Sequence, residues 1–215
     1  MKYHIVLFFL ILYTIGHSQD SLRFRDEVEG ISKKYDSLWD PSKRTVVFTG
    51  SSSIRIWKDL EQHFPQHQIV NSGFGGSQAS DLLIHIDDLI LKYNPSKVFI
   101  YEGDNDISAR KKPNAIIETT KEIIDKIKKK DNTTRIVLIS AKPSIARWNL
   151  RGKYKRLNRK FRRLSKQDEH LEFADVWTPM LDGRKVKTDI FIKDGLHMNA
   201  KGYELWHGVL KAYMD

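Results

Sequence analysis

An aspartate and a histidine stand three positions apart near the end of the sequence, as Asp194 and His197. One turn of chain can bring the two side chains together, and a carboxylate that accepts a hydrogen bond from Nδ1–H holds an imidazole in one tautomer. An imidazole held in this way can take a proton from a weak nucleophile, because its unperturbed pKa lies near neutral pH. The pair is therefore a candidate general base with its orienting carboxylate.

Hydroxyl, glycine and carboxamide groups follow three apolar segments earlier in the chain. Serines occupy positions 51–53, a glycine-rich stretch ends at Gly76, and Asn105 lies in an acidic turn. Each has an ordinary structural explanation, because serine caps helices, glycine forms turns and asparagine makes side-chain turns. Together they are the parts that acyl transfer needs: a hydroxyl that a base can activate, and N–H groups that stabilise an oxyanion.

Other kinds of active site are excluded by what the sequence lacks. It contains no cysteine, which excludes disulfides, cysteine nucleophiles, iron–sulfur clusters and cysteine-ligated zinc. The segment Gly50–Ile54 breaks the Gly-x-Ser-x-Gly pattern at its last position, and no glycine-rich phosphate loop ends in Lys-Ser or Lys-Thr. No His-Glu-x-x-His sequence occurs among the eight histidines. We therefore expect no metal and no cofactor.

Five short runs of strand-forming residues alternate with helical segments, and these elements must position the candidate side chains. The runs are Thr45–Thr49, Gln68–Asn71, Lys97–Tyr101, Thr134–Ser140 and Leu171–Ala174. Several are almost wholly apolar, as strands buried on both faces should be. Apolar residues at helical spacing predict helices over Ser21–Leu38, Ser80–Lys92, Asn114–Lys128 and Asn199–Tyr213.

This alternation predicts an α/β fold, a three-layer α/β/α sandwich with a five-stranded parallel sheet. Sites in such folds lie beyond the carboxyl ends of the strands, where the serine, glycine and asparagine groups stand. The length of 215 residues suits one domain. We assign that domain to residues 19–215, with residues 19–44 as an N-terminal helical extension packed on it.

The four blocks of candidate residues resemble those of the SGNH, or GDSL-type, esterases and lipases, from about Val46 to Tyr203. The resemblance implies a flavodoxin-like fold and assigns a role to each block. It makes Ser52 the nucleophile, the Ser52 N–H, Gly76 and Asn105 the oxyanion hole, and Asp194 and His197 the rest of the catalytic triad. Ser51 stands where the family most often has aspartate, a variant that resembles one branch of the superfamily.

Some assignments within these blocks stay open. The three serines are consecutive, so Ser53 is the alternative nucleophile, and Gly75 could exchange roles with Gly76. Ser51 and Trp148 are candidate substrate contacts, although Trp148 could equally be buried. We expect three other tryptophans to pack in the core, namely Trp57, Trp177 and Trp206.

The implied activity is hydrolysis of carboxylic esters through an acyl-enzyme. The sequence contains no long lid and no broad apolar surface, which favours a short acyl group such as acetyl on a carbohydrate. A lipid esterase of the lysophospholipase or thioesterase type is the alternative. A protein of a different class, which binds polyanions or carbohydrates without catalysis, would lack Ser52, Asp194 or His197.

Basic residues are concentrated in one segment. Ten Lys or Arg residues and no acid lie between Pro143 and Gln167, which equals the net charge of +10 for the whole chain. Tyr154, Leu157, Phe161 and Leu164 recur there at helical spacing, which predicts a helix with a buried stripe and solvated cations. Alternatively, Arg147–Lys166 contacts an anionic polymer or membrane. No nucleic-acid-binding motif is present, and we expect no specific nucleic acid partner.

Residues 1–18 have the pattern of a signal peptide. A positive start at Lys2 precedes an apolar run, Ile5–Tyr13, and small residues at Gly16 and Ser18. As a helix the run would rise about 14 Å, short of the ~30 Å hydrocarbon core of a bilayer. We therefore expect an exported protein, periplasmic or extracellular, with no integral membrane segment after removal of the leader.

Overall fold

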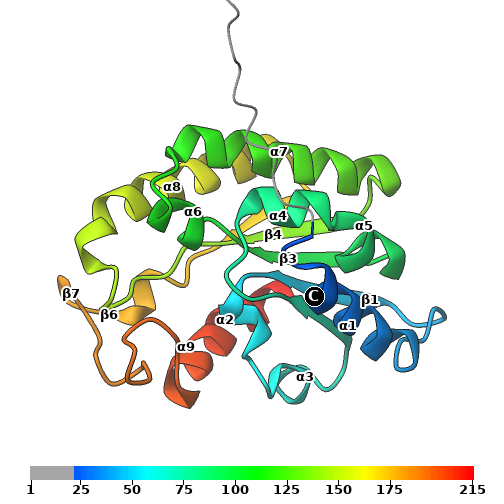
Figure 1. Ribbon diagram of the computed structural model, residues 1–215, viewed down its shortest axis with the longest axis horizontal. Helices are drawn as coiled ribbons and strands as arrows, with labels where there is room; N and C mark the ends of the chain where they lie inside the picture. The colour runs from blue at the N-terminus through cyan, green and yellow to red at the C-terminus, as the bar shows by residue number, and fades with distance from the viewer. Residues whose placement is uncertain (1–21) are drawn as a thin grey trace, which may run out of the picture.

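A five-stranded parallel sheet forms the centre of the structure, a computed structural model that describes residues 22–215 (Figure 1). The strands are β1 (Thr45–Gly50), β2 (Gln68–Gly73), β3 (Lys97–Tyr101), β4 (Arg135–Ile139) and β5 (Leu171–Ala174). Their order is β2-β1-β3-β4-β5, and every neighbouring pair is parallel. The predicted sheet is confirmed. The predicted leader, residues 1–18, lies outside the described residues.

Helices cover both faces of this sheet, which gives the three predicted layers (Figure 1). One face carries α1 (Arg25–Asp36), α4 (Ala79–Ile84), α5 (Ile86–Leu89), α7 (Pro113–Lys130) and α8 (Arg151–Leu164). The other carries α2 (Ser52–Arg55), α3 (Leu60–His63) and α9 (Ala200–Leu210). The remaining elements are α6 (Asp104–Ser108), five short 3₁₀ turns (Leu91–Tyr93, Trp148–Leu150, Ser165–Gln167, Thr178–Met180 and Lys211–Tyr213) and the two-residue strands β6 (Leu181–Asp182) and β7 (Lys185–Val186).

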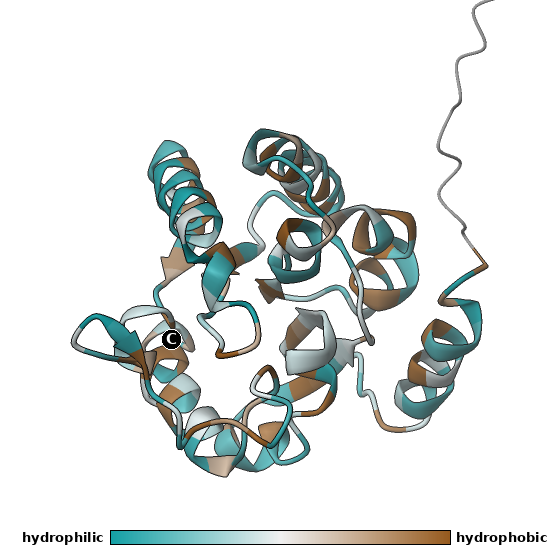
Figure 2. Ribbon diagram, turned by 60° about the vertical axis from the view of Figure 1, so that its left-hand side comes forward, coloured by the Kyte–Doolittle hydropathy of each residue, from teal (hydrophilic) through white to brown (hydrophobic). Residues whose placement is uncertain are grey.

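Side chains of each strand alternate between two hydrophobic cores. Val47 and Val98 face the core under α4, α5, α7 and α8. Phe48 and Phe99 face the core under α2, α3 and α9, where their rings stack with centroids 4.3 Å apart. Because both faces are covered, all residues of β1 are buried and the strand sequence is apolar without alternation. The outer helices are amphipathic, and Figure 2 shows both hydrophilic and hydrophobic residues along them.

The predicted helix over residues 80–92 is interrupted in the structure. It divides into α4, α5 and a 3₁₀ turn, with breaks at His85 and Ile90. The breaks let one apolar stripe stay in contact with the sheet, since Leu82, Ile86 and Leu89 are all fully buried. The short helices α2, α3 and α6 were not predicted, because a single turn shows no apolar period.

The N-terminal segment packs on the first of these cores. Phe24 and Val28 are buried, and the Phe24 ring meets Phe74 edge to face at 5.0 Å. Tyr35, at the other end of α1, accepts a hydrogen bond from the Asn71 N–H. No helix in residues 22–215 is both long enough and apolar enough to cross a bilayer.

Candidate active site

Ser52 lies at the junction of β1 and α2. The strand ends at Gly50, which has φ +124°, and a Cβ there would stand 2.1 Å from the Tyr101 carbonyl oxygen, so only glycine allows this exit from the sheet. Ser51 and Ser53 are buried, with 2% and 3% of their surface exposed, whereas Ser52 is half-buried. Among the three serines, Ser52 therefore presents its hydroxyl at the carboxyl edge of the sheet.

The Ser52 hydroxyl continues into a chain of hydrogen-bonding groups. Its Oγ lies 2.9 Å from His197 Nε2, and His197 Nδ1 lies 2.5 Å from Asp194 Oδ2. The other Asp194 oxygen accepts hydrogen bonds from the N–H groups of Leu196 and His197 at 2.8 and 2.9 Å. This arrangement requires Nδ1 to carry the proton, because a carboxylate only accepts, and it leaves Nε2 as a base toward Ser52.

The local hydrogen bonds keep Asp194 ionised. Burial acts to raise the pKa of its carboxyl group, but the hydrogen bonds from the His197 ring and from the His197 and Leu196 N–H groups outweigh burial and lower the pKa to about 2. Asp194 therefore carries its charge throughout the neutral range, where it can stabilise an imidazolium at His197.

Two backbone N–H groups near Ser52 remain available for an anion. The Ser52 N–H lies in the first turn of α2, where a helix has no acceptor of its own. Gly75 donates its N–H to Glu27 Oε1 of α1 at 2.9 Å. For Gly76, with φ +74°, no hydrogen bond of the N–H is found within residues 22–215. The two glycines that the sequence leaves open therefore differ, because the N–H of Gly75 already has an acceptor.

Asn105, in the first turn of α6, has one amide hydrogen left over. Its Nδ2 donates to the Ser77 carbonyl oxygen at 2.9 Å, and its Oδ1 accepts from Arg147 Nη1 at 3.1 Å. A carboxamide nitrogen has two hydrogens, and no acceptor for the second is found within residues 22–215. Arg147 belongs to the basic segment predicted to be a solvated face or an anion contact, yet here it orients Asn105.

The same arginine belongs to a buried ionic network centred on Asp104. Arg147 donates to Asp104 Oδ1 at 2.6 Å, as does the Tyr154 hydroxyl, also at 2.6 Å, and Lys142 Nζ lies 3.6 Å from Oδ2. Burial acts to raise the pKa of Asp104, but Lys142 and Arg147 reverse the effect and hold it below its usual value. Burial lowers the pKa of Lys142 against the opposing effect of Asp104.

Lys142 also joins this network to the loop that carries His197. Its ammonium group donates to the Leu196 carbonyl oxygen at 2.6 Å, and the Ala146 N–H donates to the Gly195 carbonyl oxygen at 3.0 Å. The residues after β4 therefore hold Asn105 on one side and the His197 loop on the other. Sequence reasoning missed Lys142, whose only signal is a lysine directly after a buried strand.

The two candidate substrate contacts lie differently. Ser51 is buried, and its N–H donates to the Tyr101 carbonyl oxygen at 3.1 Å. Trp148 is half-buried and stacks on Trp177, with ring centroids 6.2 Å apart. Their roles toward a substrate stay predictions. Trp57, Trp177 and Trp206 are buried as expected, with at most 7% of their surface exposed.

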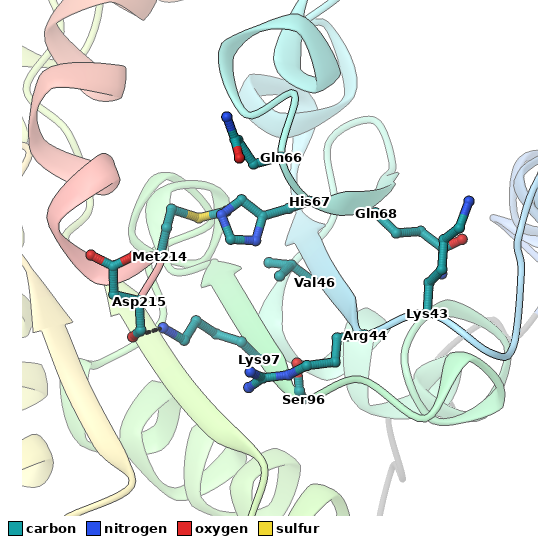
Figure 3. A pocket seen from close by; sticks show the side chains of 10 residues that line it. All are labelled: Lys43, Arg44, Val46, Gln66, His67, Gln68, Ser96, Lys97, Met214 and Asp215. Atoms are coloured by element: carbon teal, nitrogen blue, oxygen red, sulfur yellow. Dashed lines mark hydrogen bonds between the residues drawn. The ribbon is translucent and has the colours of Figure 1, made fainter.

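A cavity of about 480 Å³ lies at the opposite edge of the sheet, beside the first residues of β1 and β3 (Figure 3). It is lined by Arg44, His67 and Lys97 among others, and by no residue predicted for the active site. The Lys97 ammonium group is engaged there by the carbonyl oxygens of Tyr213 and Asp215.

The sequence model of the GDSL-like Lipase/Acylhydrolase family matches residues 36–205. The chain belongs to this family. The resemblance seen in the four blocks is therefore confirmed, and the protein is a GDSL-type acylhydrolase, an esterase by class. No curated protein matches its sequence.

Solved structures share the fold of this GDSL-type acylhydrolase. A candidate platelet activating factor from Streptococcus pneumonia is 25% identical with a TM-score of 0.77, and the match covers 89% of this chain and 94% of that one. A GDSL-like lipase from Bacteroides thetaiotaomicron is 19% identical, with a TM-score of 0.72 and coverage of 85% and 96%. An acetyl-xylooligosaccharide esterase from Geobacillus Stearmophilus is 14% identical, with a TM-score of 0.66 and coverage of 80% and 94%.

Proposed function

We propose that this acylhydrolase cleaves carboxylic esters through an acyl-enzyme on Ser52. The observation that carries the proposal is the continuous chain from Ser52 Oγ through the His197 ring to Asp194. Ser52 Oγ attacks the ester carbonyl carbon while His197 Nε2 takes its proton, and Asp194 stabilises the imidazolium. His197 then protonates the departing alcohol and activates the water that hydrolyses the acyl-enzyme.

The negative charge of the tetrahedral intermediate needs donors that are already in place. In this proposal the donors are the N–H groups of Ser52 and Gly76 and the remaining amide hydrogen of Asn105. Support comes from the hydrogen bonds of their neighbours, since Glu27 occupies the Gly75 N–H and Arg147 fixes the orientation of Asn105.

The test is turnover of p-nitrophenyl acetate by purified variants. Ser52→Ala and His197→Ala should each lower kcat by roughly 10⁴-fold or more, because neither attack nor proton transfer is then available. Ser53→Ala is the matched control, since that serine is buried beside the site, and it should keep most of the activity. Equal rates in the Ser52→Ala and unaltered enzymes would overturn the proposal and favour a non-catalytic polyanion- or carbohydrate-binding protein.

For the substrate we propose a short acyl group, such as acetyl on a carbohydrate. The fold shared with an acetyl-xylooligosaccharide esterase supports this choice. Acetylated oligosaccharides should be better substrates than long-chain p-nitrophenyl esters. A kcat/KM that rises steeply with acyl length would instead indicate a lysophospholipase or thioesterase type of enzyme.

We also propose export to the periplasm or the exterior, with removal of residues 1–18. The charged start and apolar run of that segment support it. Mass spectrometry of the protein recovered outside the cytoplasm should give a chain that begins near residue 19. Recovery of the full-length chain in the cytoplasm alone would contradict export.

The outward face of α8 supports a second proposal, contact with an anionic polymer. Its cations Arg156, Arg159 and Arg163 are exposed, and the helix contains no acid. The protein should bind heparin with a strong salt dependence, and replacement of these three arginines by glutamine should weaken the retention. Retention on heparin that is unchanged by the three replacements would contradict the proposal.

A further inference from the structure

Two histidines and a glutamate meet away from the active-site chain, on the sheet face covered by α2, α3 and α9. His63 ends α3, while Glu204 and His207 lie one turn apart on α9. One ligand atom from each side chain lies within 4.8 Å of the other two. The His63 side chain is 9% exposed and that of Glu204 is 68% exposed, so the group opens to solvent on one side.

Both ring nitrogens of His63 lie close to oxygen atoms. Nδ1 lies 2.8 Å from the Asp59 carbonyl oxygen, which only accepts, so we assign the tautomer with the proton on Nδ1. Nε2 then has a lone pair, and it lies 3.2 Å from Glu204 Oε1, which is also an acceptor. A cation that binds both Nε2 and Oε1 would satisfy the two acceptors.

His207 adds a third donor atom beside this pair. Its ring meets the His63 ring with centroids 4.8 Å apart and planes at 72°. One ring nitrogen of His207 lies within 4.8 Å of the ligand atoms of His63 and Glu204. Asp59 Oδ2 lies 3.8 Å from His63 Nδ1.

Two neutral imidazoles and one carboxylate are the ligand set of many open zinc sites. The Asp59 carbonyl behind His63 Nδ1 is the kind of outer partner that orients metal-binding imidazoles. We propose that His63, Glu204 and His207 bind a divalent transition-metal cation of the Zn²⁺ class, with water in the open position, and thereby join α3 to α9.

The required rearrangement is small. Donor atoms about 2.1 Å from a tetrahedral cation stand about 3.4 Å from one another. The His63 and Glu204 atoms are already 3.2 Å apart, so the main adjustment is a side-chain rotation of the half-buried His207. In this proposal the metal has a structural role. It joins α3, which follows the helix that begins at Ser52, to α9, which follows the loop that carries His197.

A different pair of histidines is close together in the sequence but not in one site. His63 and His67 are four residues apart, but Pro65 stands between them, α3 ends at His63, and His67 lines the cavity of Figure 3. The expectation of no metal rests on spacing along the chain, which cannot reveal ligands brought together from α3 and α9.

The experiment uses the full protein after treatment with a chelator, with ZnCl₂ alone as the probe. Calorimetry should give one saturable Zn²⁺ site per chain, and the thermal midpoint should rise with Zn²⁺. Glu204→Ala and His207→Ala should each weaken binding by more than about 100-fold, whereas His67→Ala, the matched control, should bind as the unaltered protein does.

Co²⁺ gives a second measurement that does not depend on stability. The unaltered protein should show the visible absorption of tetrahedral Co²⁺, and His207→Ala should not. Glu204 is exposed, so its replacement is expected to fold and to leave turnover of p-nitrophenyl acetate unchanged. If no saturable site is found, or if His207→Ala binds Zn²⁺ as the unaltered protein does, the proposal is overturned.

Discussion

At the scale of single residues, the role proposed for Asn105 predicts a defined loss of turnover. Its oxygen and one amide hydrogen are engaged by Arg147 and Ser77, so the side chain is fixed before substrate binds. Asn105→Ala should lower kcat by ~100-fold or more, with a smaller change in KM, because the lost donor acts on the transition state. Initial rates with p-nitrophenyl acetate give both constants. Asn149→Ala, at an exposed position, should leave both unchanged.

Asp194 gives a prediction about pH. Its pKa in the folded protein is about 2, below its ordinary value of 3.8, so the stability it contributes is present above pH 3.8 and is lost as pH falls toward 2. The difference in urea midpoint between the unaltered protein and Asp194→Asn should therefore shrink from about pH 5 to about pH 2. A difference in urea midpoint that stays constant across that pH range would contradict the hydrogen bond between Asp194 and His197.

The motif blocks predict the residues of the candidate site, but they do not predict how these residues are supported. Ser52, Gly76, Asn105, Asp194 and His197 are identified by the motif blocks. Which serine faces the histidine, and which glycine N–H is already bound, depends on burial and on contacts with distant segments. The roles of Lys142 and Glu27 were missed because a lysine or glutamate in sequence carries no sign of the partner it will meet.

At the scale of elements, the segment after β4 connects the two halves of the site. Lys142→Met removes the cation between Asp104 and the Leu196 carbonyl oxygen. Loss of one partner from a buried ionic group costs about 3 kcal/mol, which urea unfolding should detect. The Lys142→Met substitution should also lower kcat more than it changes KM, because the His197 loop loses its hydrogen bond from Lys142. Lys153→Met, at an exposed position on α8, should change neither.

The exit from β1 depends on one glycine. Gly50→Ala would place a methyl group against the Tyr101 carbonyl oxygen in a backbone conformation unfavourable to alanine. We expect a lower thermal midpoint and a loss of turnover through displacement of Ser52. A methyl group at Gly152 in α8 would meet no atom within 4 Å, so Gly152→Ala should be neutral or slightly stabilising.

All five strands could be predicted at nearly their observed bounds. The composition of β3 is largely apolar because all of its residues are buried. The helix over residues 80–92 could be predicted only as a continuous segment, because no proline or glycine in the sequence marks its breaks at His85 and Ile90.

At the scale of the whole molecule, two cores share one sheet and should unfold together. Phe99→Ala, in the core under α9, and Ile123→Ala, in the core under α7, each remove a fully buried side chain. Each should lower the free energy of unfolding by about 3 kcal/mol. Circular dichroism and residual esterase activity should report one common urea midpoint for each variant. Separate midpoints would indicate that the two layers unfold independently.

All but the last residue of the first helix, α1, precedes the part of the chain that matches the family. The match begins at residue 36. Glu27, which precedes it, accepts a hydrogen bond from the Gly75 N–H, and its Oε1 lies 3.3 Å from Arg55 Nη1. An enzyme truncated to begin at residue 36 would keep every motif, but it would lose the contacts of Glu27 with Gly75 and Arg55. Residues outside the family match are thus expected to affect the reaction through their contact with the glycine turn.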